Sequence, residues 1–126
     1  MALKDDICSA MESYIMTAPS DWNTVTAEEL KQEIASNTKL LLLDVRERDE
    51  YASGHIPGAV NISVRELPKR VSELPHEKDL KIVAYCASGI RSAYATMFLR
   101  VYGYSDVRSL VHGIREWVAT GNQIVA

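Results

Sequence analysis

The sequence predicts an α/β fold in which a mostly parallel, five-stranded sheet is covered by helices on both faces. Short apolar segments of strand length alternate along the chain with helix-like segments, which is the pattern of successive β-α-β units. One such segment, residues 40–45, opens with four consecutive leucines, as is typical of a strand buried on both faces. The length of 126 residues suits one domain with its own core.

The chain is expected to begin with an amphipathic helix over residues 5–18, and Pro19 ends it. The apolar side chains of this helix recur at spacings of three and four: Ile7, Met11, Tyr14, Ile15 and Ala18. Cys8 is interpreted as a helix-packing residue rather than a resolving thiol. We divide the chain into a helical extension, residues 1–20, and a main domain, residues 21–126.

The main domain is expected to start with a short strand at residues 22–25 and a helix with a capping box. Thr26 is the predicted N-cap, and Glu29 stands three residues later, where its side chain can bond back to the cap. We expect this helix to bury Leu30 and Ile34.

The later elements continue the alternation of strand and helix. The helix over residues 92–102 is expected to bury Ala93, Met97, Phe98 and Val101. The other predicted elements are a helical turn at 46–52, strands at 59–62, 81–85 and 106–110, short helices within 64–74, and a helix at 114–119.

Composition and charge exclude several classes of function. The net charge is −3, so no basic field recruits nucleic acid or an acidic membrane surface. No apolar run approaches the ~18–20 residues of a membrane span, and the first residues lack the regions of a signal peptide. Two cysteines are too few for a disulfide framework. We expect a cytoplasmic protein that needs neither a cofactor nor a metal.

Cys86 is the most informative residue because it follows the strand at 81–85 directly and opens the loop that ends at Arg91. A strand, a short loop and a helix in this order point backbone N–H groups and a helix N-terminus at the thiol. Such a site lowers a thiol pKa from ~8.5 to roughly 3.5–7.5, which makes the sulfur a nucleophile at neutral pH. The alternative is an inert cysteine buried in the core.

Four stretches carry a family resemblance. They are Leu-Leu-Asp-Val-Arg-Glu at 42–47, Glu-Tyr-Ala-Ser-Gly-His-Ile-Pro-Gly-Ala-Val-Asn-Ile at 50–62, Cys-Ala-Ser-Gly-Ile-Arg-Ser at 86–92, and Leu-Val-His-Gly at 110–113 with Trp117. In this order, across roughly residues 22–122, they resemble the single-domain rhodaneses, a sulfurtransferase family. Two positions depart from the family pattern: His112 often is a glycine, and Ala87 often is a basic residue.

The resemblance implies a rhodanese-like fold and a two-step reaction. The Cys86 thiolate takes the outer sulfur of thiosulfate, a polysulfide or a persulfide, and passes it from a Cys86 persulfide to cyanide, a thiol or a protein. Backbone amides of the loop are expected to surround this anion. The loop residues that we assign to substrate binding are Ala87, Ser88, Gly89, Ile90, Arg91 and Ser92.

Two arginines near the expected site have two interpretations each. Arg91 either holds the oxyanion end of the donor in its planar fork or ties the loop to a carboxylate. Arg46 either adds positive potential near the thiolate and binds substrate, or forms an ion pair with an acid. Asp44 and His112 are assigned supporting roles at the rim of the site.

Two other functions compete with sulfur transfer. The first is a cysteine-based phosphatase or arsenate reductase, because rhodanese-like folds include enzymes that handle phosphate and arsenate. Cysteine-based phosphatases use a Cys-x5-Arg loop, whereas Cys86 and Arg91 are separated by four residues, which makes a tighter ring. The second alternative is a non-catalytic interaction or sulfur-carrier module built on the same fold.

Overall fold

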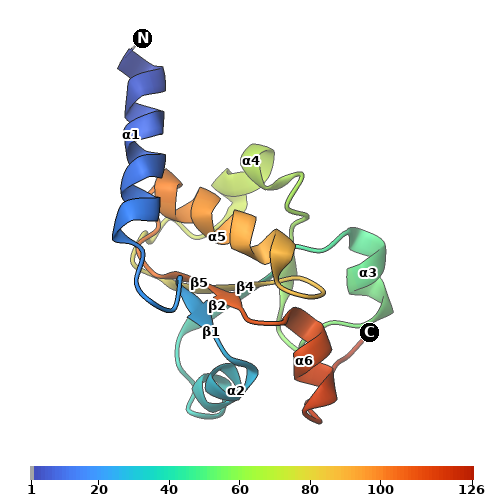
Figure 1. The fold of residues 1–126 in the computed structure, drawn as a ribbon. Coiled ribbons are helices and arrows are strands. Elements are labelled where there is room, and N and C mark those ends of the chain that lie inside the picture. The colour runs from blue at the N-terminus through green and yellow to red at the C-terminus, as the bar shows by residue number, and fades with distance from the viewer. Residues whose placement is uncertain (1) are drawn as a thin grey trace.

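A five-stranded sheet forms the centre of the molecule, and every neighbouring pair of strands is parallel. The structure is a computed structural model that describes residues 2–126 (Figure 1). In spatial order the strands are β1 (Thr24–Val25), β5 (Val107–Leu110), β4 (Lys81–Tyr85), β2 (Leu40–Asp44) and β3 (Val60–Asn61). The predicted fold class is therefore confirmed, with β4 at the centre of the sheet.

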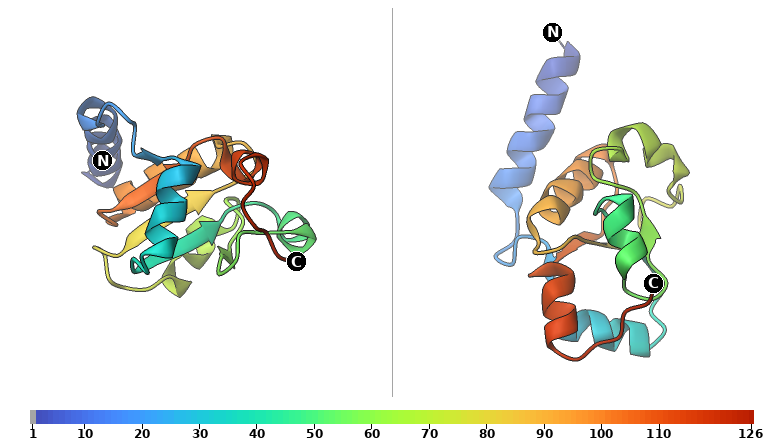
Figure 2. Two further views of the ribbon diagram at one scale, coloured as in Figure 1. Left: turned by 90° about the horizontal axis from the view of Figure 1, so that it is seen from below. Right: turned by 90° about the vertical axis from the view of Figure 1, so that its right-hand side faces the viewer.

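The helices cover both faces of the sheet (Figures 1 and 2). They are α1 (Ala2–Thr17), α2 (Ala27–Ala35), α3 (Arg48–Ser53), α4 (Leu67–Arg70), α5 (Ile90–Tyr102) and α6 (Gly113–Ala119), with a 3₁₀ turn at Val71–Glu73. Alternate side chains of a strand point to opposite faces. Val83 and Tyr85 consequently share a core with α2 and α6, whereas Ala84 and Cys86 share the other core with α4 and α5.

The helix α2 forms as its cap predicts, although it buries less than expected. The Thr26 side chain accepts a hydrogen bond from the Glu29 amide at 3.1 Å, and the Glu29 carboxylate accepts one from the Thr26 amide at 2.9 Å. Leu30 is fully buried, as predicted. Ile34 is 41% exposed, because it lies outside the core cluster that covers Leu30.

The helix α5 turns a different face to the sheet from the one that hydropathy predicted. Ala93 is exposed, and Met97, Phe98 and Val101 are only partly buried. The buried residues are Ser92, Ala95, Thr96 and Leu99. Small polar side chains fit this position because the Thr96 hydroxyl donates to the Ser92 carbonyl at 2.8 Å and so stays satisfied.

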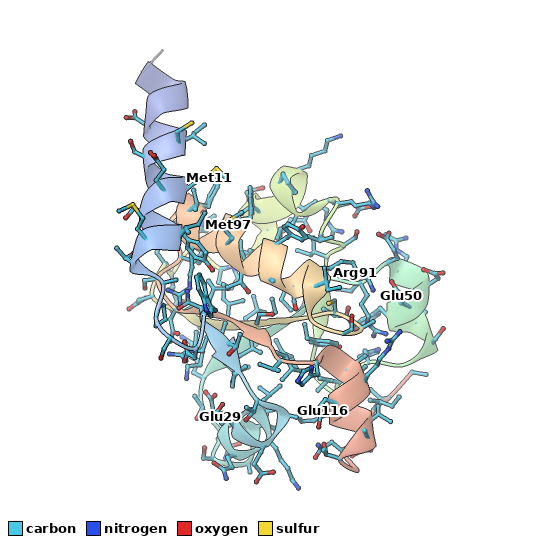
Figure 3. The ribbon with its side chains drawn as sticks, viewed as in Figure 1. Met11, Glu29, Glu50, Arg91, Met97 and Glu116 are labelled. Carbon is cyan, nitrogen blue, oxygen red and sulfur yellow. The ribbon has the colours of Figure 1, made fainter. Side chains whose placement is uncertain are left out.

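The helix α1 begins earlier than predicted, at Ala2, and only part of it rests on the domain. Its first turns project beyond the rest of the molecule, and Met11 faces Met97 of α5 (Figures 2 and 3). Ile7 and Ile15 are 49% and 57% exposed, and Cys8 is exposed, so the expected packing of Cys8 is wrong. Among the described residues, no helix combines the length and hydropathy that crossing a bilayer requires.

Candidate active site around Cys86

Cys86 lies at the carboxyl end of the central strand, and its side chain is buried with 1% exposure. Because it continues the alternation of Ile82 and Ala84, it points to the face covered by α5. The loop that follows returns over the sulfur before α5 begins at Ile90. Burial alone is what an inert core cysteine would show, so the polar groups around the sulfur decide between the two interpretations.

Those groups are backbone amides and a serine hydroxyl that surround the sulfur. The Gly89 amide donates to the Cys86 Sγ at 3.1 Å, and the Cys86 thiol donates to the Ser92 Oγ at 3.6 Å. Burial by itself raises the pKa of the Cys86 thiol, but the amide and hydroxyl of Ser92 and the amides of Gly89 and Ser88 more than offset it, so this pKa is lowered. The sulfur therefore sits in a ring of donors that stabilises its anion.

The loop takes this shape through Gly89 and a pair of serine hydroxyls. Gly89 has a φ of 107°, a left-handed conformation that side chains disfavour, and it is the N-cap of α5. The Ser92 Oγ is 3.2 Å from the Gly89 carbonyl and 2.7 Å from the Ser109 Oγ of β5. These contacts fix the hydroxyl of Ser92 beside the sulfur.

Arg91 is paired with an acid from another part of the chain. Its two terminal nitrogens donate to Glu50 of α3 at 2.7 and 3.0 Å, and the two side chains point toward each other (Figure 3). The bidentate bond to Arg91 is the main cause that lowers the pKa of Glu50 to about 2. Of the two interpretations of Arg91, the link to a carboxylate is formed in this structure. Its role in binding a substrate stays a prediction.

Arg46 is likewise held in an ion pair, here with Asp44. Its guanidinium donates to both Asp44 oxygens, the shortest contact being 2.7 Å, and to the Gly54 carbonyl at 2.7 Å. The side chains are 8% and 0% exposed. The ion-pair alternative for Arg46 is thus the one that the structure contains. The pair supports the strand end next to the Cys86 loop, and a direct contact of Arg46 with substrate stays a prediction.

The turn between β5 and α6 is hydrogen-bonded to the Cys86 loop. The Ile114 amide donates to the Cys86 carbonyl at 2.9 Å, and the Arg115 amide donates to the Ala87 carbonyl at 3.2 Å. His112 has a φ of 61°, so it occupies a left-handed position that usually favours glycine. Its ring is exposed beside the loop, where the sequence predicted a supporting role.

The structure brings most of the predicted residues into one place. Ala87, Ser88, Gly89 and Ser92 surround the sulfur or carry the loop, whereas Ile90 is 68% exposed on its outer side. Two residues that sequence reasoning did not select also belong here, namely Glu50 and Ser109. Glu50 carried a signal, because it stands at the third position of α3 and caps the Glu47 amide at 2.9 Å. Ser109 carried none.

Comparisons with known proteins agree with this geometry. The model of the Rhodanese-like domain family matches residues 26–120. A sulfurtransferase of Allochromatium vinosum is 39% identical over 82% of this chain and 95% of its own, and the human thiosulfate:glutathione sulfurtransferase is 36% identical over 75% and 92%. The crystal structure of a rhodanese-related protein from Thermoplasma volcanium covers 82% of this chain and 97% of its own, with 33% identity and a TM-score of 0.73. The chain belongs to the rhodanese-like domain family, whose relatives include named sulfurtransferases.

Proposed function

We propose that this protein is a sulfurtransferase that carries sulfur as a persulfide on Cys86. In the first step the Cys86 thiolate attacks the outer sulfur of thiosulfate, and a new S–S bond forms while sulfite leaves with the bonding electron pair. In the second step cyanide or a thiolate attacks the outer sulfur of the persulfide, and the Cys86 thiolate is released. Covalent catalysis of this kind replaces one difficult transfer by two easier ones.

The ring of donors around the sulfur carries this proposal. The Gly89 amide at 3.1 Å and the Ser92 hydroxyl at 3.6 Å stabilise the thiolate that attacks and that later leaves. Arg91 lies at the end of the same loop, and its positive charge interacts favourably with the Cys86 anion. A thiosulfate dianion at the loop adds a second acceptor for Arg91, which Glu50 holds in a partly exposed position. Polysulfides and other persulfides are donors that the same two steps accommodate.

Intact-mass measurement after thiosulfate treatment tests the proposal. We expect a gain of one sulfur atom in the unaltered protein and in Cys8→Ser, which removes the exposed cysteine. Cys86→Ser should show no gain, and cyanide should remove the added sulfur from the loaded protein. If neither thiosulfate, a polysulfide nor a persulfide adds sulfur at Cys86, the fold serves as a non-catalytic module and the proposal is wrong.

A further inference from the structure

A cavity of about 480 Å³ adjoins the Cys86 loop and is built partly by residues that precede the family match. Its lining includes Ser88 and Gly89 of the loop, Tyr94 and Met97 of α5, and Tyr14 and Trp22. Tyr14 belongs to α1, and Trp22 lies between α1 and β1, whereas the family model begins at residue 26. Tyr14 of the N-terminal extension and Trp22 of the turn that follows therefore form part of a wall beside the reactive loop.

The cavity lies close to the sulfur. Gly89, which lines it, donates to the Cys86 Sγ at 3.1 Å. Ser109 also lines it, and its hydroxyl is 2.7 Å from the Ser92 Oγ, which itself lies 3.6 Å from the sulfur. A molecule that places an apolar group in this cavity therefore lies beside the loop, and its thiol has to extend past Ser88 and Gly89 to reach the sulfur.

The lining is aromatic and carries little charge. No Lys, Arg, Asp or Glu among the described residues lines the cavity. Trp22 and Tyr94 are 60% and 64% exposed, which leaves large aromatic surfaces open to water next to a concave space. Pockets of about 300–1,000 Å³ with aromatic walls and a few hydroxyl groups are typical sites for small organic ligands.

The backbone around Trp22 forms a hydrogen-bonded turn. Trp22 and Asn23 have φ values of 54° and 58°, and two successive left-handed residues other than glycine are uncommon. The Trp22 amide donates to the Pro19 carbonyl at 2.9 Å, and the Asn23 amide donates to the Asp21 carboxylate at 3.0 Å. The indole is consequently carried by a hydrogen-bonded turn.

We infer that this cavity binds the uncharged aromatic or branched apolar group of a small organic thiol, which accepts sulfur from Cys86. The inference rests on the proposed function. The thiolate of the acceptor attacks the outer sulfur of the Cys86 persulfide, the new S–S bond forms, and the old one breaks with its electrons returning to Cys86. An uncharged cavity beside the loop favours such an acceptor over thiols that carry several charges.

A matched pair of acceptors tests this specificity. 2-Phenylethanethiol and 2-mercaptoethanol share the ethanethiol unit and differ in a phenyl group against a hydroxyl group. After loading with thiosulfate, we expect kcat/KM to favour the phenyl compound, and we expect Tyr94→Ala and Trp22→Ala to reduce this preference about three- to tenfold. Tyr102→Ala is the control, since Tyr102 lies on the same helix, is 53% exposed and does not line this cavity. Equal preferences in Tyr94→Ala and Tyr102→Ala would refute the inference.

Binding without chemistry separates this inference from the proposed function. 2-Phenylethanol carries no thiol, and we expect it to change the tryptophan fluorescence of the chain saturably in the unaltered protein and in Tyr102→Ala, but more weakly in Tyr94→Ala. Absence of saturable binding contradicts the cavity assignment even where Cys86 gains sulfur. Saturable binding that depends on Tyr94 upholds a ligand site even where no persulfide forms.

Discussion

Of the glycine-to-alanine substitutions in this chain, Gly113→Ala is expected to disturb the Cys86 loop most. A Cβ at Gly113 would lie 2.4 Å from the Cys86 carbonyl oxygen and 2.6 Å from the Ala87 carbonyl carbon and oxygen. All three are backbone atoms that cannot rotate away as a side chain does. In addition, the φ of 60° places an alanine in the left-handed region.

The left-handed backbone and the close contacts together determine how far the free energy of unfolding falls. A left-handed non-glycine residue costs roughly 1–2 kcal/mol. Forcing an extra methyl group into packed atoms costs about 1–3 kcal/mol. Together they lower the free energy of unfolding by about 2–5 kcal/mol, a large part of the ~5–15 kcal/mol of an ordinary domain. The displaced Cys86 carbonyl also moves the loop, so loading of Cys86 by thiosulfate should slow.

Urea unfolding followed by tryptophan fluorescence measures this loss. Gly121→Ala is the matched control, because Gly121 has a φ of 86° but no atom within 4 Å of the added Cβ. Gly121→Ala should lose only the free energy of unfolding that the left-handed backbone costs, roughly 1–2 kcal/mol, and it should keep its rate of thiosulfate loading. If the two variants lose the same free energy and load at the same rate, the contact between α6 and the Cys86 loop is not as the structure describes.

Three further predictions concern charge. In a Cys8→Ser background, the pH midpoint of Cys86 alkylation should fall below the ~8.5 of an ordinary thiol. Ser92→Ala should raise this midpoint. If Ser92→Ala leaves the midpoint unchanged, Ser92 does not stabilise the thiolate. Because the folded pKa of Glu50 is about 2, its pair with Arg91 stabilises the fold above the ordinary value of 4.5 and loses this effect as the pH falls toward 2. Glu50→Gln should therefore lose about 0.5–1 kcal/mol near neutral pH and nothing at the acid end, whereas a pH-independent loss points to another cause. Asp44→Asn breaks a buried pair and should cost about 3–5 kcal/mol in urea unfolding, against at most ~1 kcal/mol for Glu77→Gln in an exposed pair; similar losses would contradict the buried network.

The sequence predicted the order of elements well because each strand and helix carries a local signal. The capping box at Thr26 and the four leucines from Leu40 are examples, and both elements form where they were expected. The position of Cys86 at the end of β4 followed from the same kind of signal. The loop chemistry depends on residues close together in the chain, so it too was accessible from the sequence.

Contacts between distant segments were not accessible in this way. Glu50 and Arg91 are 41 residues apart, and only the fold brings α3 to the start of α5. The orientation of α5 was missed because hydropathy favours Phe98 over Thr96, whereas the structure buries Thr96 and satisfies its hydroxyl within the helix. Ser109 joined the site through a hydroxyl contact between β5 and α5, for which no pattern in the sequence exists.

The covalent intermediate is the central claim, and an isotope label on the outer sulfur of thiosulfate tests it most directly. After the protein is separated from excess donor, one labelled sulfur per chain should remain on the peptide that contains Cys86, and the released sulfite should be unlabelled. Added cyanide should then convert this protein-bound label into thiocyanate. Labelled thiocyanate formed from the two small molecules together, with no label ever retained at Cys86, would contradict the account.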